Sequence, residues 1–391
     1  MKIWSRSSRM TIPPTKRKKS DDALPTSATS SDVSPQTKRS LRIGVNTIYL
    51  VPGSGEEEYF LRCLLRTFSL EHPEIELVLF TDPVNDVAFA SWQRVCLEGA
   101  ERETRFSRIE HMLQEIVQAE QVDRLLTPFI TAPVHCPVPT VPYIMEPEML
   151  DVTMEGGGFW INRKVKDLVR AAQNAAALIV PTEFARKRML RTLEIPMNKM
   201  VVAPPGVNHA VTEPQPCTIE TPYILTVGPT HPHRNTERLL QAFERIRDKI
   251  PHNLVVVGEA GEAEPASWGP RVLRIQRCPS EQLAGLYQHC DLVVCPLLEP
   301  CSGISVLEAL YCGARVVAGK VGAIPEVARS APVYCEPTQV SSIAATILYA
   351  LNEEEPYRKQ RIRSGKQIAG EYTWSRCTER VLIALRRRPE T

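Results

Sequence analysis

The sequence contains no long apolar run. Its longest apolar stretches, such as Ala175–Val180 and Leu254–Val257, are as long as a strand, whereas a membrane-spanning helix needs about 20 apolar residues. The first 22 residues also lack the apolar stretch of a secretory leader. We therefore expect a cytoplasmic protein, and we keep peripheral contact with the inner face of the membrane as an alternative.

An excess of charge of one sign is also missing. The 47 Lys and Arg residues nearly balance the 45 Asp and Glu residues, so that the formal net charge is +2. This balance excludes a strongly basic nucleic-acid-binding protein as well as a strongly acidic chain. The 11 cysteines include no Cys-x-x-Cys pair, and so lack the thiolate spacing of a zinc site. We interpret them as reduced, small apolar residues of the core.

Residues 1–40 are rich in Ser, Thr, Pro, Lys and Arg and contain little that a core could bury. Such a composition predicts a disordered tail. The basic run Lys16–Lys19 would suit a nuclear address or an electrostatic hold on anionic lipid. We favour the plainer interpretation of a solvated tail, or of a start codon assigned too early, with Met10 as the alternative start.

From residue 41 onward, buried-strand patterns alternate with helical spacing. In the first half we expect strands over Leu41–Leu50, Glu76–Thr81, Thr140–Met145, Ala177–Pro181 and Met200–Ala203, and helices over Glu56–Leu70 and Ala185–Leu193. The segments Gln93–Arg108 and Thr153–Arg163 have no readable period and are interpreted as acceptor loops. Strand, helix, strand is the order that builds a parallel sheet with both faces covered.

A polar, proline-bearing segment at 208–221 is interpreted as a linker, and a second alternating series follows it. Here we expect strands over Tyr223–Gly228, Asn253–Gly258, Leu292–Cys295 and Ala314–Val317, and helices over Thr236–Lys249, Ser280–His289 with a serine cap, Ser305–Cys312, Ile343–Leu351 and Glu355–Gly370. The chain thus holds two α/β halves of similar size. Two parallel sheets that face each other make a cleft, and ligands bind at the carboxyl ends of such strands.

The segment Pro296–Gly313 carries the strongest chemical signal. A strand ends before it, a loop with Gly303 follows, and a helix is expected to start at Ser305. The unpaired amides and the positive dipole end of a helix start suit a diphosphate, and the Glu308 carboxylate could accept hydrogen bonds from two ribose hydroxyls. The spacing Ser305-x-x-Glu308 is also that of a capping box, which we favour on the local pattern alone.

A second cluster, Val227–Arg238, also follows a strand and precedes a helix. Arg234 and His233 would lie at the carboxyl end of that strand, where a guanidinium can hold phosphate oxygens with two parallel hydrogen bonds. Taken alone, Arg234 would be interpreted as a solvated loop residue. His231 and His233 lie two residues apart without a carboxylate partner, so we expect no metal site.

With these clusters in view, the chain resembles the glycosyltransferase family 4 enzymes over about residues 43–385. The resemblance rests on Gly303–Val327, Tyr223–Phe243, Ser280–Asp291, Pro181–Arg186 and Val201–Val207, which occur in the family's order and spacing. It implies the GT-B fold, an α/β architecture of two facing Rossmann-like domains with an interdomain cleft. The implied division is an N-terminal acceptor domain over 41–207, a linker over 208–221, a nucleotide-sugar-binding domain over 222–371, and a C-terminal helix over 372–391 that crosses back to the first domain.

The resemblance also implies roles for individual residues. Arg234 takes the place of a lysine that grips the donor diphosphate, and Glu308 matches the glutamate that binds the ribose. Further donor contacts are expected from His233, from the base-framing Arg277 and Cys278, from the phosphate-binding loop Gly303, Ile304 and Ser305, and from Gly53 and Gly55 in the turn after the first strand. Members of the family retain the anomeric configuration and need no metal, so we expect no cofactor besides the nucleotide sugar.

The sequence departs from the family pattern near the donor sugar. The position of the family's first glutamate holds Pro300, with Glu299 one residue earlier, and Met145-Glu146 stands where many members have His-Asp. We take Arg234, Glu299 and Glu146 as the catalytic candidates. The predicted function is the transfer of a sugar from a nucleotide-diphosphate sugar, with GDP-mannose as first choice, to a glycan, lipid or other acceptor. The alternative, suggested by Pro300 and Met145, is a non-catalytic nucleotide-sugar-binding or scaffolding protein on the same fold.

Overall fold

The computed structural model describes residues 40–48, 50, 56–97, 106–128, 133–145, 169–207, 214–217, 219, 222–228, 232–258, 265, 267–276 and 278–388. Residues 1–39 of the expected tail and most of the expected linker lie outside these ranges. The described residues from Ser40 onward belong to one compact unit. Within the described ranges, no helix is both long enough and apolar enough to cross a membrane.

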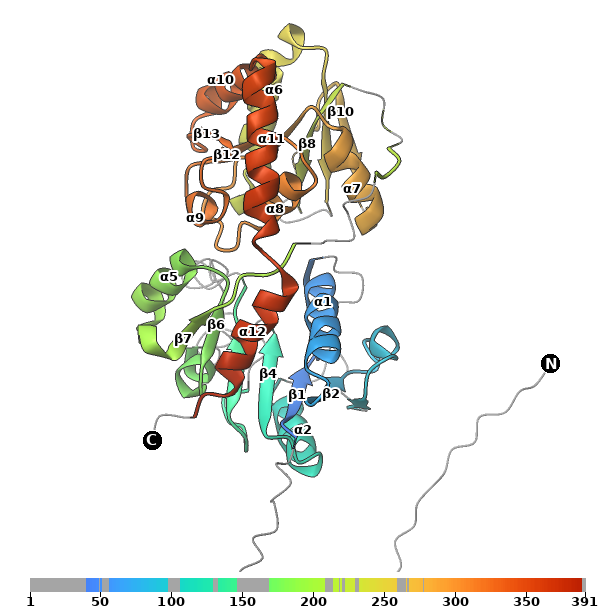
Figure 1. Cartoon of the computed structure of the whole chain (residues 1–391), viewed down its shortest axis with the longest axis vertical. Coiled ribbons are helices and arrows are strands. Elements are labelled where there is room, and N and C mark those ends of the chain that lie inside the picture. The colour runs from blue at the N-terminus through green and yellow to red at the C-terminus, as the bar shows by residue number, and fades with distance from the viewer. Residues whose placement is uncertain are drawn as a thin grey trace, which may run out of the picture. The chain divides into compact units, whose positions relative to one another are not determined.

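The first half of the described chain forms a parallel sheet with the strand order β3-β2-β1-β4-β5-β6-β7 (Figure 1). Its strands are β1 (Arg42–Asn46), β2 (Glu76–Thr81), β3 (Arg94–Cys96), β4 (Arg124–Pro128), β5 (Thr140–Tyr143), β6 (Leu178–Val180) and β7 (Met200–Val202). The connecting helices include α1 (Glu56–Glu71), α2 (Phe106–Ala119), α5 (Glu183–Leu193) and the short η1 (Val87–Phe89) and η2 (Met197–Lys199). The consecutive residues Val78 and Leu79 enter different apolar clusters, because side chains alternate across a strand and both faces are covered.

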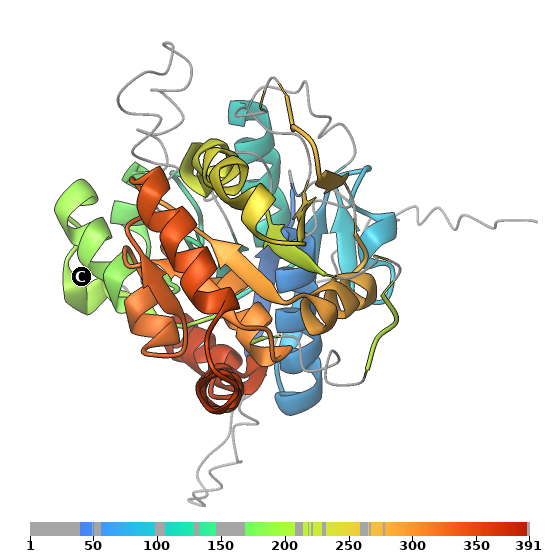
Figure 2. The ribbon, with the colours of Figure 1, turned by 90° about the horizontal axis from the view of Figure 1, so that it is seen from above.

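The second half forms another parallel sheet, with the order β10-β9-β8-β11-β12-β13. Its strands are β8 (Tyr223–Val227), β9 (Asn253–Val257), β10 (Val272–Ile275), β11 (Leu292–Cys295), β12 (Val316–Gly319) and β13 (Val333–Cys335). Helices α6 (Thr236–Ile246) and α10 (Val340–Leu351) pack with Ile224. Helices α7 (Ser280–His289), α8 (Ile304–Tyr311), α9 (Ile324–Ala328) and α11 (Glu355–Gly370) pack with Leu225. Helices therefore cover both faces of this sheet (Figure 2).

Each sheet has a point where the direction of strand addition reverses. In the second sheet the chain runs outward from β8 to β9 and β10, and then returns to place β11 on the other side of β8. Strands β8 and β11 are direct neighbours, with Leu292 beside Ile224 and Val293 beside Leu225. Loops that follow two such strands diverge to opposite sides and leave room for a ligand between them. This topology directs attention to the loops after β8 and β11.

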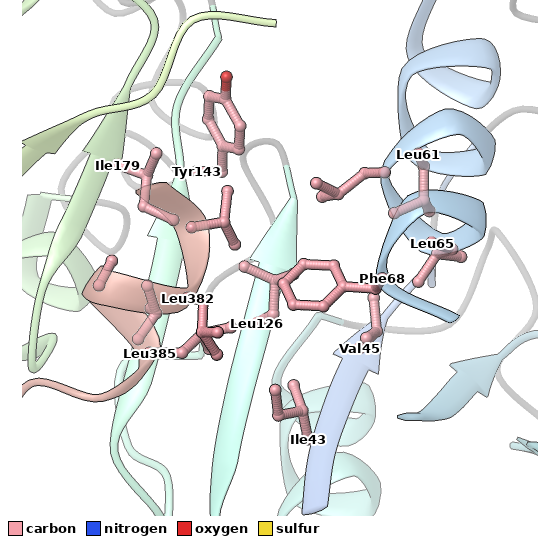
Figure 3. Packing of buried hydrophobic residues seen from close by; sticks show 14 of the residues in the cluster. Ile43, Val45, Leu61, Leu65, Phe68, Leu126, Tyr143, Ile179, Leu382 and Leu385 are labelled. Atoms are coloured by element: carbon pink, nitrogen blue, oxygen red, sulfur yellow. The ribbon is translucent and has the colours of Figure 1, made fainter. Parts of the chain in front are cut away.

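The last helix, α12 (Trp374–Leu385), packs against the first sheet. Its Leu382 and Leu385 belong to the same apolar cluster as Leu126 of β4 (Figure 3). The Arg124 side chain donates a hydrogen bond from Nε to the Leu385 carbonyl at 3.1 Å. The end of the chain is thus built into the core of its first half.

The structure differs from the sequence expectations mainly in the short elements. The segment interpreted as a loop over Gln93–Arg108 contains β3 and the start of α2, and the pattern did not indicate β4, β10, β13 or α9. These elements are three to five residues long, apart from α2, which is too short for a period to emerge. The expected strand over Ala314–Val317 is shifted and runs from Val316 to Gly319. The expected serine cap is wrong, because Ser280 is the first residue of α7 and Pro279 precedes it as the N-cap.

Candidate functional site

The loops after β8 and β11 are bonded to each other. The short helix η4 (Pro232–Arg234) follows β8, and its His233 carbonyl accepts a hydrogen bond from the Leu298 amide at 2.9 Å. The Asn235 side-chain amide donates to the Pro296 carbonyl, also at 2.9 Å. The two loops that the topology brings to the same edge of the sheet therefore hold each other in place.

Asn235 is a positioning residue that the sequence analysis did not single out. It is buried, and its side-chain amide donates a second hydrogen bond to the Pro337 carbonyl at 2.7 Å, so that it joins the loops after β8, β11 and β13. Its backbone is left-handed, with φ at +61°, a conformation that Asn adopts more readily than most residues. The sequence feature that could have indicated this role is the asparagine directly after Arg234. Asn235 is the N-cap residue of α6, but its side chain does not cap that helix.

Arg234 lies against the end of β8. Gly228, the residue after that strand, has φ at +130°, and a Cβ built on it would come within 2.8 Å of the guanidinium carbon of Arg234. Gly228 is needed there for two reasons, since its φ disfavours other residues and its lack of a side chain leaves room for the guanidinium. The backbone of Gly228, at the end of β8, thus lies directly against the Arg234 guanidinium.

Cys295, the last residue of β11, interacts electrostatically with Arg234 and is hydrogen-bonded to the Ser305 side chain at the start of α8. Burial raises the pKa of the Cys295 thiol to about 12, and the neighbouring Arg234 charge and a hydrogen bond with the Ser305 side chain act in the opposite direction. The hydrogen bonds between the two loops bring the segment with Arg234 to the loop that leads into α8. The assignment of the guanidinium and the helix start to one donor site stays a prediction.

The helix start at α8 corrects the expected capping box. The N-cap is Gly303, with φ at +67° and no side-chain cap, and the helix begins at Ile304. Ser305 is thus the second helical residue, and its buried side chain is directed to Cys295 instead of the helix amides. A Cβ at Gly303 would also come within 2.7 Å of the Val327 side chain. The amides of the first helical turn have no carbonyl acceptors within the helix, so the amides at the start of α8 can donate hydrogen bonds to an anion.

Glu308 interacts electrostatically with two residues of α1. It is half-buried on α8, and its charge contributes to raising the pKa of both Tyr59 and Cys63 on α1, where burial is the larger cause. Tyr59 and Cys63 are also hydrogen-bonded to each other through their side chains. The sequence analysis found Glu308 but missed Tyr59, because residues 249 positions apart show no pairing signal in one sequence.

Glu299 lies in the loop after β11, but its carboxylate is bonded to the first half of the chain. Its Oε2 is 2.8 Å from the Arg188 guanidinium on α5. The Glu299 side chain is 65% exposed, whereas that of Arg188 is only 12% exposed. The expected contact between Glu299 and the donor sugar stays a prediction, and the structure adds Arg188 as its partner.

The remaining candidates are placed in part. Ile304 and Cys278 both pack, partly buried, against the core of the second sheet, and burial raises the pKa of the Cys278 thiol. Four candidates lie outside the described residues, namely Gly53, Gly55, Glu146 and Arg277. No group of three His, Cys, Asp or Glu residues suited to a metal ion occurs in the described part of the chain. The expectation of no metal stays a prediction, because His231 and Glu146 are not among the described residues.

Comparison with known proteins identifies the second half of the chain. Residues 215–368 match the sequence model of the family "Glycosyl transferases group 1". This part of the chain is a group 1 glycosyltransferase domain. The match contains β8, β11, α8 and the loops that carry Arg234, Gly303 and Glu308.

The group 1 glycosyltransferase domain has relatives among mannosyltransferases. The chain is 25% identical to O-antigen chain mannosyltransferase B of Escherichia coli over 239 residues, which are 56% of this chain and 62% of that protein. It is 23% identical to the GDP-mannose-dependent alpha-(1-6)-phosphatidylinositol dimannoside mannosyltransferase of Mycobacterium tuberculosis, over 55% of this chain and 59% of that protein. The chain thus spans about three fifths of the length of these two relatives.

Solved structures confirm the GT-B architecture expected for a group 1 glycosyltransferase. The sucrose-phosphate synthase of Thermosynechococcus elongatus matches with a TM-score of 0.69 at 15% identity, over 88% of this chain and 98% of that one. The Anabaena protein HepE, solved in complex with UDP-glucose, matches with a TM-score of 0.67 at 15% identity, over 88% and 99% of the two chains. At such low identity these matches establish the fold and leave the substrate open.

Proposed function

We propose that the chain transfers a hexosyl residue from a nucleotide-diphosphate sugar, with GDP-mannose as first choice, to a glycan or lipid-linked acceptor with retention of the anomeric configuration. The observation that carries this proposal is that the loop with Arg234 and the loop that leads into α8 are hydrogen-bonded to each other, from the Leu298 amide to the His233 carbonyl and from the Asn235 side chain to the Pro296 carbonyl. The two loops lie at the reversal point of the second sheet and within a group 1 glycosyltransferase domain. A fixed cation and a row of helix amides at such a point suit two linked phosphates.

The proposed chemistry is the breaking of the bond between the anomeric carbon and the diphosphate oxygen. The electron pair leaves with the diphosphate, the acceptor hydroxyl oxygen forms the new bond to the anomeric carbon on the same face, and its proton passes to an oxygen of the departing diphosphate. Negative charge grows on the departing diphosphate, so the Arg234 guanidinium and the amides of Ile304 and Ser305 would stabilise the transition state more than the ground state. The nucleotide sugar is the only small molecule that this proposal requires.

The rest of the donor would extend from the diphosphate over the second sheet. Glu308, four residues beyond Ile304 on the same helix, is assigned to the ribose hydroxyls. Arg277 and Cys278 are assigned to the base, and His233 to the phosphates beside Arg234. Gly53, Gly55 and Glu146 would approach the donor from the first half of the chain.

The choice of mannose rests on relatives. Both relatives described above are named as mannosyltransferases, and the Mycobacterium tuberculosis protein is named as GDP-mannose-dependent. The Anabaena structure holds UDP-glucose instead, so both donors belong in the test. A lipid-linked acceptor would bring the chain to a membrane surface, and the expected peripheral contact stays a prediction.

The experiment that tests the proposal combines binding and transfer. The melting temperature is measured with GDP-mannose, UDP-glucose and the free nucleotides, because a ligand that binds only the native state raises it. Transfer is then measured on a panel of acceptors with wild type, Arg234→Ala and the control Arg245→Ala, which removes an exposed arginine of the same helix region. We expect Arg234→Ala to lower transfer by roughly 100-fold or more and Arg245→Ala to leave it unchanged.

Two outcomes would contradict the proposal. Unchanged transfer in Arg234→Ala would remove the role of the guanidinium. Binding of a nucleotide sugar to wild type without transfer or hydrolysis would instead favour the non-catalytic binding protein that Pro300 and Met145 suggest.

A further inference from the structure

Helix α5 of the first half is bonded to the loop between β11 and α8. The Thr182 hydroxyl, at the N-cap of α5, donates a hydrogen bond to the Cys301 carbonyl at 2.6 Å and accepts one from the Ala185 amide at 3.1 Å. Thr182 and Cys301 are both buried. The Thr182 hydroxyl therefore caps α5 and, at the same time, bonds to the loop between β11 and α8.

The N-terminal end of α5 also binds a carboxylate from α9. The Glu183 and Phe184 amides donate to the two carboxylate oxygens of Glu326 at 2.8 and 2.9 Å. Together with the Thr182 cap, these bonds satisfy three amides of the first turn of α5. A carboxylate is favoured at this end of a helix by the amide donors and by the helix dipole.

One turn further along α5, Arg188 pairs with Glu299 at 2.8 Å. Cys301, two residues after Glu299, belongs to the apolar cluster of Ile144, Leu178 and Met189 in the first half of the chain. The loop is thus held by an ion pair, a hydrogen bond and a buried side chain. We call the Thr182–Cys301, Glu326–α5 and Arg188–Glu299 contacts the α5 contacts.

Two of the α5 contacts, Thr182–Cys301 and Arg188–Glu299, act on the loop that carries the start of α8. The Pro300 carbonyl accepts a hydrogen bond from the Ala323 amide of the second half at 2.8 Å, while the next carbonyl, that of Cys301, is held by Thr182 of the first half. Gly303, two residues later, is the N-cap of α8. The position of that helix start relative to Arg234 therefore depends on contacts from both halves of the chain.

We propose that α5 is a positioning element for the donor site, which holds the loop from Leu298 to Gly303 so that the start of α8 stays aligned with Arg234, and that Glu299 acts through Arg188 instead of touching the donor sugar. This inference rests on the proposed function. It assigns a role to Glu299, which precedes Pro300 by one residue: Glu299 pairs with Arg188 and so holds the loop. Because a bound diphosphate would itself draw α8 and Arg234 together, loss of the α5 contacts should weaken donor binding more than it slows the transfer step.

The first test exchanges the two charges. Arg188→Glu and Glu299→Arg are each measured alone and then combined. The control is Arg191→Glu, which makes the same charge change about one turn away, at a residue whose Nε donates a hydrogen bond to the Lys187 carbonyl of its own helix. Each single variant should raise the KM for the donor at least roughly fivefold with kcat within about twofold of wild type. The double variant should return the KM to within about twofold of wild type, because the pair is restored with its signs reversed.

The second test needs no turnover. Hydrogen exchange is measured at the Leu298 amide, which bonds His233, and at the Ala323 amide, which bonds Pro300. Both amides bond to backbone carbonyls of the second half of the chain. Faster exchange at both in Arg188→Glu, and restored protection in the double variant, would therefore show that α5 holds the loop. Arg191→Glu should leave both amides as in wild type.

The results separate the two roles of Glu299 and the two proposals. A lowered kcat in Glu299→Arg that the double variant does not restore, with unchanged exchange, would overturn the inference in favour of direct contact with the donor. Normal KM and normal exchange in both single variants would also overturn it. If wild type transfers no sugar, the proposed function fails, and the exchange measurement still decides whether α5 positions the loop.

Discussion

The guanidinium of Arg234 rests on Gly228: a Cβ at residue 228 would come within 2.8 Å of the guanidinium carbon. Gly228 directly follows β8, and Arg234 is the last residue of η4. A methyl group at residue 228 would therefore force the Arg234 side chain to shift. The missing side chain at Gly228 leaves room for the positive charge.

Gly228→Ala should lower kcat/KM for the donor by roughly 10- to 100-fold, since it displaces a charge-assisted contact to the diphosphate. It should also destabilise the protein by about 1–3 kcal/mol, because φ at +130° is strained for alanine. The control is Gly269→Ala, whose φ is +73° and whose Cβ would have no atom within 4 Å. The control should lose stability without losing activity, and equal losses of activity in both variants would contradict the prediction.

Asn235 should contribute measurably to the free energy of unfolding, although it lies in a loop, because it is buried and hydrogen-bonded. Asn235→Gly keeps the left-handed backbone and removes the hydrogen bonds to Pro296 and Pro337, so we expect a loss of about 1–3 kcal/mol in the free energy of unfolding. Asn235→Asp should be worse, because it turns a carboxylate oxygen toward two carbonyl oxygens. Urea unfolding of both variants checks this order, and an aspartate variant as stable as wild type would refute it.

Strand β11 and helix α11 have the expected ends, whereas α12 runs over Trp374–Leu385, inside the expected range 372–391. Strand β11 was predictable because four apolar residues in a row indicate a buried strand. The start of α8 was not predictable, because Ser305-x-x-Glu308 fits a capping box as well as a helix that begins at Ile304. The partner of Glu299 could not be inferred either, since Arg188 lies 111 residues away and only the packing of α5 against the loop brings the two together. Local patterns give elements, and the contacts that tune the site are long-range.

Stability should fall with acid partly because of His252. Burial lowers the pKa of its imidazole below the ordinary value of 6.5, although the neighbouring Asp291 acts in the opposite direction. Below about pH 6.5 the unfolded chain therefore binds more protons at this residue than the folded chain, and the free energy of unfolding decreases as the pH falls. His252→Gln should flatten the pH dependence between about pH 5 and 7 in urea unfolding. The control His111→Gln removes an exposed histidine, and an unchanged slope in His252→Gln would contradict the assignment.

Glu326 should stabilise the protein through the end of α5 to which it is bonded. Glu326→Gln keeps one acceptor but removes the charge that two amides and the helix dipole favour, so we expect a loss of about 0.5–1.5 kcal/mol at low salt. The difference from wild type should shrink at about 1 M salt, where the screening length is only about 3 Å. The matched control is Glu355→Gln, which also lies in the first turn of a helix but pairs with Lys359 of that same helix. Equal losses in the two variants would contradict this role of Glu326. A larger, salt-sensitive loss in Glu326→Gln would confirm that its carboxylate stabilises the N-terminal end of α5 in the other half of the chain.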